Sequence, residues 1–409
     1  MKSIGTLGLA AVFAVMGAPS FAQTQDSIKI GVVGPGSGPY TIIGEEVRNG
    51  FELYLSEING MAGGRKLEMI YEDTQAKPDV GLTKVRKLVE KDGASFIGGV
   101  VSSSVAYALR DYIVAQKLPL LVTVASADGL TQQGAAPNIF RTGTSGSQAS
   151  HPLGKWLYEK GGFKRLAIIA PNYAMGYEQT GGFARTFVEA GGKIVKTLYP
   201  PMGAPDFGPF LTSFDPSTVD AVGAVFAGSD AIKFVKQYSE YGLKGKTPLV
   251  ATILLTDDLI LQQQGDAALG IISASHYSSA LDTAANKKFV DAYRAKYKRV
   301  PTVYSEASYV GARVIAEAVT ALKGNISNPD ELNAAIKKVT FEAPRGAFRF
   351  DDYNSPIHSV HIFKVEKVNG QLINKPIDEF KNVSQFWTWS PKDYMAMPNY
   401  SDAANSWVK

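Results

Sequence analysis

The chain contains no cysteine, so it can form no disulfide and offers no cysteine-ligated metal site, thiolate nucleophile or lipid-bearing cysteine. Histidine is scarce as well. The four histidines are His151, His276, His358 and His361. None of them is paired at metal-ligand spacing on a predicted helix, and the last two lie along a predicted strand. We therefore expect no metal centre.

Long hydrophobic runs are also missing, apart from one near the N-terminus. Ile4 to Ala18 is apolar, but it is shorter than the roughly 20 residues that a membrane helix needs. A lysine precedes this run, and the small residues Ser20 and Ala22 follow it at the spacing of a signal-peptidase site. We predict that residues 1–22 are a cleaved signal peptide. The mature chain, beginning near Gln23, is then exported without a lipid anchor to an oxidising compartment such as the bacterial periplasm.

Signatures of enzymes and of nucleic-acid binding are absent too. No serine stands in a G-x-S-x-G elbow. Gly34, Gly36 and Gly38 follow a predicted strand, but Pro39 occupies the place of the third glycine of a dinucleotide-binding fingerprint. Lysine and arginine total 42 against 38 aspartates and glutamates, and no basic run stands out. The sequence therefore predicts no enzyme, no cofactor and no nucleic-acid partner.

What the chain does contain, from Ser27 onward, is an alternation of short β-branched runs with longer segments of helical period. This alternation is typical of α/β proteins whose parallel sheets are covered by helices. The expected strands are 28–33, 67–71, 96–100, 118–124, 166–170, 194–199, 221–227, 249–252, 271–277 and 359–366. A Gly-, Ser- and Thr-rich linker, Arg141 to Ser150, separates the first four strands from the rest. Two Rossmann-like lobes are expected.

Three loops at the carboxyl ends of predicted strands are candidates for binding, because open α/β sheets bind their ligands there. They are residues 36–40, 102–104 and 125–127. Hydroxyls and free backbone N–H groups at a helix N-terminus attract anions. The serines of 102–104 equally suit a helix N-cap, and both roles stay open.

The order and spacing of several segments resemble the periplasmic binding proteins of branched-chain amino acid ABC transporters. The resemblance rests on Ile30 to Pro35 with Ser37 and Gly38, Gly98 to Ser104, Leu130-Thr131, Ile139 to Thr142, Val188 to Val195 and Asp206-Phe207. It implies two lobes joined by three crossover strands. The lobes would comprise 27–142 with 277–352, and 143–276 with 353–384, followed by an aromatic-rich tail at 385–409 that we expect to be a packing strap.

The resemblance also implies a ligand site between the lobes. The family's carboxylate-binding positions correspond to Ser102 with Ala125 and Ser126. Further candidates for ligand contact are Ser37, Tyr40, Ser103, Tyr173, Met175, Tyr177, Ser229, Leu254 and Tyr304.

Departures from the family pattern bear on the ligand class. Met175 replaces the family's tyrosine before a glycine, and Ile253 and Leu254 stand near the acidic position that holds an ammonium. An ammonium without a carboxylate partner would be a poorly compensated buried charge. We therefore expect an apolar or aromatic carboxylate, whereas Asp257 and Asp258 would restore amino acid binding if they fill the acidic position.

The function that follows is the exported, solute-binding component of an ABC uptake transporter. It would capture a small carboxylate by hinge closure, act as a monomer and deliver the ligand to a membrane permease. Two alternatives stay open at this point: a branched-chain amino acid binding protein, and the ligand-sensing domain of a receptor.

Overall fold

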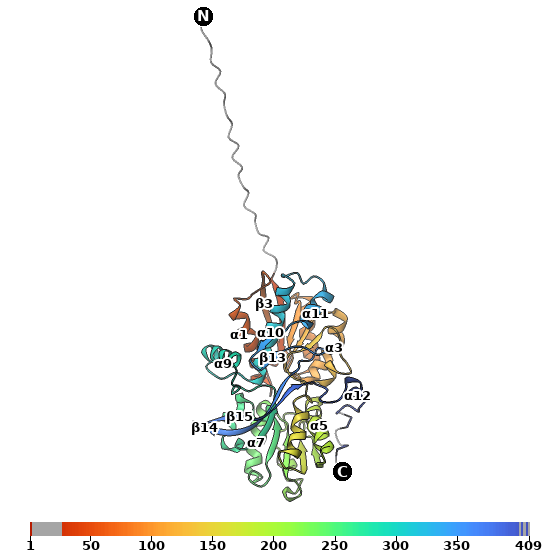
Figure 1. The fold of residues 1–409 in the computed structure, drawn as a ribbon, viewed down its shortest axis with the longest axis vertical. Helices are drawn as coiled ribbons and strands as arrows, with labels where there is room; N and C mark the ends of the chain where they lie inside the picture. Colours follow the sequence, from red (N-terminus) through yellow and green to blue (C-terminus); the bar gives the residue numbers. More distant parts are fainter. Residues whose placement is uncertain (2–26, 401, 404–405, 408–409) are drawn as a thin grey trace.

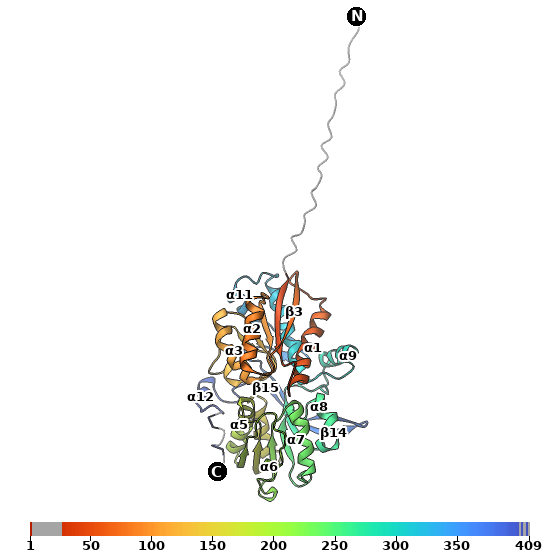
Figure 2. The same cartoon turned by 180° about the vertical axis from the view of Figure 1, so that it is seen from behind.

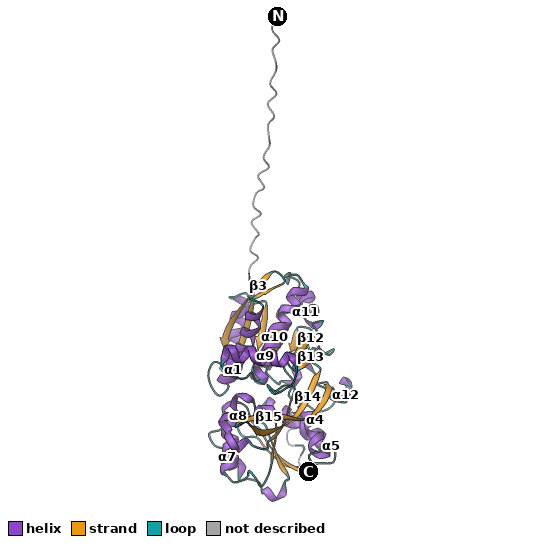
Figure 3. Cartoon of the chain, turned by 60° about the vertical axis from the view of Figure 1, so that its left-hand side comes forward, coloured by secondary structure: helices purple, strands orange, loops and turns teal. Residues whose placement is uncertain are grey.

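The computed structural model describes residues 1, 27–400, 402–403 and 406–407. The predicted signal peptide, apart from Met1, lies outside these residues. Figure 1 shows two lobes, one above the other, with β14 and β15 crossing where they meet. Figure 3 shows sheet strands flanked by helices in each lobe. In the described part of the chain, no helix has the length and apolar character needed to cross a membrane.

Lobe one is built on a six-stranded sheet with the order β2-β3-β1-β4-β5-β6, parallel except between β2 and β3. Its strands are β1 (Ile28–Gly34), β2 (Met61–Ala62), β3 (Arg65–Asp73), β4 (Phe96–Gly99), β5 (Leu120–Val122) and β6 (Ile139–Arg141). Its helices are α1 (Thr41–Glu57), α2 (Pro78–Glu90), α3 (Ser103–Gln116), α9 (Ala284–Tyr297), α10 (Val303–Ala321) and α11 (Pro329–Lys337).

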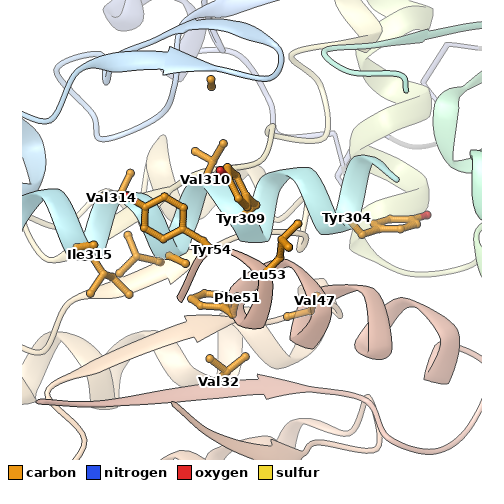
Figure 4. Packing of buried hydrophobic residues seen from close by; sticks show 14 of the residues in the cluster. Val32, Val47, Phe51, Leu53, Tyr54, Tyr304, Tyr309, Val310, Val314 and Ile315 are labelled. Carbon is orange, nitrogen blue, oxygen red and sulfur yellow. The ribbon is translucent and has the colours of Figure 1, made fainter. Parts of the chain in front are cut away.

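Helices cover both faces of this sheet, which explains why its inner strands β1, β4 and β5 are buried and largely apolar. Val32 on β1 packs with α1 and α10 on one face, where Phe51 and Val310 lie (Figure 4). Its neighbour Val33 points to the other face and packs with α2 and α3, which Figure 2 shows from behind. Successive residues of a strand alternate between faces, so one strand supplies both cores.

Lobe two is built on a seven-stranded sheet with the order β15-β14-β11-β10-β9-β7-β8. Its strands are β7 (Arg165–Ile169), β8 (Lys193–Leu198), β9 (Ala221–Ala224), β10 (Leu249–Thr252), β11 (Ile272–Ser275), β14 (His358–Val368) and β15 (Gln371–Val383). Only β14 and β15 run antiparallel to their neighbours. The helices are α4 (Ser150–Glu159), α5 (Ala174–Glu189), α6 (Gly208–Leu211), α7 (Gly228–Glu240) and α8 (Asp258–Gln264).

Three connections join the lobes: β6 to α4, β11 to α9, and the short hairpin of β12 (Phe341–Ala343) and β13 (Gly346–Phe348) to β14. The first connection falls on the predicted linker, but that segment is not a loose surface loop. Arg141 ends β6 and Ser150 begins α4, and Thr142, Ser145 and Gln148 between them are fully buried. The small Gly, Ser and Thr side chains allow this segment to pack closely between the lobes instead of lying in solvent.

The aromatic tail lies against both lobes. Thr131 of lobe one donates a hydrogen bond to Gln385 at 2.9 Å. Beyond α12 (Pro391–Met395), the Tyr400 hydroxyl lies 2.6 Å from Nε2 of His151 on α4. These contacts fit the packing role that the sequence suggested for the tail.

Candidate functional site

A cavity of about 60 Å³ lies between the lobes. Lobe one lines it with Tyr40, Ile43, Val101, Thr123, Val124, Ser126, Val303 and Tyr304. Lobe two and the connections line it with Thr144, Ser145, Gly146, Ala149, Tyr173, Met175, Gln179, Ala227, Thr252, Ile253, Leu254, Ala274, Ser275 and His276. One ordered water needs only about 10–15 Å³ on a comparable measure, so the space suits a small organic molecule.

Two tyrosines from opposite lobes meet at this cavity. The Tyr40 hydroxyl at the start of α1 lies 2.6 Å from the Tyr173 hydroxyl at the start of α5. The Tyr173 hydroxyl also lies 3.2 Å from the sulfur of Met175. Burial raises the pKa of both phenols above the usual value, so they stay neutral. The two hydroxyls therefore connect the lobes at the cavity without introducing a charge.

Six of the residues predicted from the sequence line the cavity, and six do not. Those that line it are Tyr40, Ser126, Tyr173, Met175, Leu254 and Tyr304. Ser37 and Ser229 are exposed instead, and the Ser37 hydroxyl donates to Asp73 at 3.1 Å. The predicted Tyr177 also lies outside the lining, where its hydroxyl donates to Asn172.

The two serine loops contribute in unequal ways. Ser126 lines the cavity, and its hydroxyl lies 3.2 Å from that of Ser103, which also accepts the Ala127 N–H at 3.1 Å. Ser103 therefore holds the Ser126 loop in place from behind. Ser102 occupies the N-cap position of α3, but its hydroxyl makes no capping hydrogen bond. The hydroxyl of Ser102 thus does not serve the helix-cap role.

A fully buried arginine, which sequence reasoning missed as a site element, fixes the second loop. The Arg141 guanidinium donates to the carbonyl oxygens of Ala125 at 2.6 Å and Ala127 at 2.7 Å. These bonds clamp the backbone on both sides of Ser126. The Ile139-Phe140-Arg141-Thr142 segment was part of the family resemblance, but its pattern did not reveal this role. Arg141 positions the loop and does not itself line the cavity.

The described lining of the cavity contains no aspartate, glutamate, lysine or arginine. Asp257 and Asp258, the acids that could have served an ammonium, lie outside it and have other partners. Asp257 caps α8 by accepting the Leu259 N–H at 3.0 Å, and Asp258 accepts the Ser279 hydroxyl at 2.7 Å. Burial raises the pKa of both carboxyls. The lining therefore offers no fixed charge to either end of a ligand.

Several polar atoms of the lining have no hydrogen-bond partner among the described residues. They are the hydroxyls of Ser145 and Tyr304 and both ring nitrogens of His276. Burial and the nearby Arg345 lower the pKa of His276 well below its usual value, so its ring is neutral. An unpaired buried polar group costs about 1–3 kcal/mol, which favours a ligand that hydrogen-bonds to these atoms. Ser145 lies in the buried connection that the sequence presented only as a linker.

Comparisons with known proteins agree with this architecture. A family model described as "periplasmic binding protein" matches residues 27–371. "Leu/Ile/Val-binding protein homolog 6" of Brucella melitensis is 28% identical over 93% of this chain and 97% of that protein. A solved ABC transporter substrate-binding protein from Sphaerobacter thermophilus is 36% identical with a TM-score of 0.83, covering 88% of this chain and 99% of the other.

A second solved structure is a solute-binding protein of an ABC transporter from Rhodopseudomonas palustris BisB5, in complex with 3,4-dihydroxybenzoic acid. It is 31% identical with a TM-score of 0.84, and the match covers 88% of this chain and 99% of that protein. The family model spans most of the chain and both lobes share the fold of the solved structures, so this chain belongs to the periplasmic binding protein family.

Proposed function

We propose that this chain captures a small aromatic carboxylate between its lobes and delivers it, as an exported monomer, to a membrane ABC permease. The observation that carries the proposal is the buried cavity with aromatic walls and hydroxyl groups but no charged side chain in its described lining. The bound 3,4-dihydroxybenzoic acid of the Rhodopseudomonas palustris BisB5 protein is a ligand of this class. That protein, which binds this acid, has a closely similar fold.

The carboxylate would be held by hydroxyls and backbone N–H groups of lobe one and its connection to lobe two. Ser126 is the central donor, clamped by Arg141 and Ser103, and Ser102 and Ser145 complete the proposed seat. Neutral donors are sufficient, because hydrogen bonds to a charged group contribute about 1.5–3 kcal/mol each. The ring would lie against Tyr40 and Tyr304.

Ligand capture would proceed by hinge closure, with lobe one formed by 27–142 and 277–352 and lobe two by 143–276 and 353–384. The Tyr40–Tyr173 hydrogen bond then forms only when the lobes meet. No catalytic role is proposed for any of these residues. The ligand leaves unchanged when the lobes separate at the permease.

The ligand class is tested by calorimetric titration of the purified mature protein with benzoate, 4-hydroxybenzoate, leucine, isoleucine and valine. We expect at least one aromatic acid to bind ten times more tightly than any of the amino acids, because each amino acid would bury an ammonium without a partner. Tenfold corresponds to about 1.4 kcal/mol, which is less than the cost of desolvating an ion. Micromolar leucine binding without any response to the acids would contradict the proposal.

A branched-chain amino acid is the second candidate, and the name of the Brucella melitensis relative is what favours it. That candidate requires an acid at the cavity. Asp257 is the acid nearest to Ile253 in the sequence, but its side chain caps α8. The same titrations decide between the two classes.

Closure is tested at Gly228, a lobe-two glycine whose backbone lies close to the backbone of lobe one. A Cβ placed on Gly228 would lie 2.8 Å from the carbonyl oxygen of Pro39. Overpacking of this kind costs about 1–3 kcal/mol. It destabilises only the closed form, because Gly228 and Pro39 belong to different lobes. We expect Gly228→Ala to weaken binding of the tightest aromatic acid about tenfold.

Gly242→Ala is the matched control, because both glycines have positive φ but nothing lies within 4 Å of a Cβ on Gly242. Both variants should lose a similar small amount of stability from left-handed backbone strain. Only Gly228→Ala should lose affinity in calorimetry. Equal affinities for the two variants would show that the lobes do not close through this contact.

A further inference from the structure

A polar pair stands on the lobe-two wall of the cavity, apart from the serines of lobe one. Gln179 lies on α5, one helical turn after Met175, and both side chains line the cavity from the same helix face. Thr252, the last residue of β10, lines it beside them. The Thr252 hydroxyl donates to the Gln179 side-chain oxygen at 2.6 Å. Neither residue was among those singled out from the sequence.

The hydrogen bond from Thr252 leaves the other half of the amide for a ligand. Gln179 is 5% exposed, and no described residue accepts a hydrogen bond from its Nε2 atom. The two N–H groups of the amide are therefore available to a ligand, on a wall of the cavity that solvent hardly reaches. Leu254 and Ile253 lie in the same lining and have no polar side-chain atom, and the Met175 sulfur already accepts from the Tyr173 hydroxyl.

The chemistry of this wall discriminates among ligands. An N–H donor suits an oxygen that carries lone pairs, such as a phenol hydroxyl, an ether oxygen or a carbonyl. It does not suit an ammonium, which has donors only, and the amide oxygen already uses one of its two lone pairs to accept from Thr252. A carboxylate held by lobe one would leave the opposite end of a flat ring facing lobe two.

We infer that Gln179, oriented by Thr252, selects aromatic acids that carry an oxygen substituent on the ring at the end remote from the carboxylate. This inference rests on the proposed function and narrows its ligand class to ring-hydroxylated or ring-alkoxylated acids. Lobe one recognises the carboxylate, and lobe two recognises the substituent. Both poles are therefore engaged only when the lobes close on one molecule.

The test is the ratio of the dissociation constants of benzoate and 4-hydroxybenzoate, measured by calorimetry on the mature protein. We expect 4-hydroxybenzoate to bind about tenfold more tightly than benzoate to the unmodified protein, because benzoate leaves the amide donors unpaired. Gln179→Met keeps the length of the side chain and removes the donors, so the ratio should fall below about threefold.

Two further variants make the result specific. Thr252→Val removes the hydrogen bond that orients the amide and should lower the ratio as well, which covers the case in which Gln179→Met fails to fold. Gln133→Met replaces an exposed glutamine outside the lining and should leave the ratio at its original value.

The outcomes separate this inference from the proposed function. If neither benzoate nor 4-hydroxybenzoate binds the unmodified protein, the proposed function fails and the inference fails with it. If both bind with a ratio near one, or if Gln179→Met and Thr252→Val keep the tenfold ratio, the inference alone is wrong and aromatic acid binding stands.

Discussion

Arg345→Met is expected to lower the free energy of unfolding by about 3–5 kcal/mol, because it leaves a buried carboxylate without its partner. Arg345 donates to Glu306 through Nε at 2.9 Å and through Nη2. Both side chains are fully buried where the lobes meet. Burial raises the pKa of Glu306, whereas Arg345 opposes that rise.

The pH dependence of this deficit has a definite sign. Without Arg345, the pKa of Glu306 rises further, and the carboxyl takes up a proton, which removes its unpaired charge. The folded state then binds more protons than the unfolded state over that range, so stability falls as the pH rises. Urea unfolding should therefore show a larger deficit for Arg345→Met at pH 8 than at pH 5.

Lys155→Met serves as the control, because Lys155 and Glu159 form an exposed pair at 3.8 Å on α4. An exposed helix pair contributes only about 0.3–0.5 kcal/mol, so this variant should unfold close to the unmodified protein. A double variant, Arg345→Met with Glu306→Leu, should recover much of the lost stability, because it leaves no buried charge. A loss below about 1 kcal/mol in Arg345→Met would contradict the buried pairing.

The alternation of strands and helices could be predicted from the sequence because each element carries its own period. Strand 249–252 was predicted at its observed limits, and β1 ends one residue beyond the prediction. The strand pair β14 and β15 was harder, since β15 is largely exposed and polar and the local sequence pattern predicted only β14, while the family resemblance implied a pair. Its hydrogen bonds come from a partner strand, a long-range pairing that no local pattern reveals.

The candidate site was predictable where a loop followed a strand, as for Tyr40 and Ser126. Tyr173, Met175, Leu254 and Tyr304 were named only with the help of the family resemblance. Gln179 and Arg141 were not found, because a glutamine within a helix and an arginine at a strand end look like surface residues until the tertiary fold buries them. Tyr173 and Tyr177 are one helical turn apart, yet only the first lines the cavity. Which tyrosine faces the cavity depends on where α5 begins, and it begins at Ala174. Helix boundaries are the least certain part of a sequence prediction.

Glu178 connects the lobes through a second contact whose charge state depends on closure. The Tyr107 hydroxyl of α3 in lobe one donates to Glu178 on α5 in lobe two at 2.7 Å. Burial, followed by the nearby Asp128 carboxyl of lobe one, raises the pKa of Glu178 to about 8, while Tyr107 and Arg141 oppose the rise. At neutral pH, burial and Asp128 therefore favour the protonated form of Glu178 in the closed form.

Opening the lobes would separate Glu178 from Tyr107 and Asp128 and return its pKa toward the ordinary glutamate value of about 4.3. Between that value and about 8, the closed form binds one proton more than the open form. Ligand binding, which requires closure, should therefore take up close to one proton in this window. Affinity should fall as the pH rises through the window and level off above about pH 8.

The expected result is that the dissociation constant for benzoate rises by nearly tenfold for each pH unit between about pH 6 and 7.5, where the benzoate carboxyl is already ionised. Glu178→Gln keeps the shape of the side chain and cannot titrate, so its affinity should be nearly constant over the same range. Calorimetry at pH 7 in two buffers of different ionisation enthalpy should give an uptake close to one proton for the unmodified protein and close to zero for Glu178→Gln.

Glu189→Gln is the matched control, because Glu189 ends the same helix α5 and its pKa is also raised by burial, but it makes no hydrogen bond to lobe one among the described residues. Its pH profile should keep the slope of the unmodified protein. If Glu178→Gln keeps that slope as well, Glu178 is not the group that takes up the proton. If the unmodified protein shows no slope, Glu178 stays protonated or stays buried in the open form, and closure does not change its environment. A flat profile in Glu178→Gln alone would show that the Tyr107–Glu178 contact forms and breaks with ligand, which ties proton uptake to the movement of the two lobes.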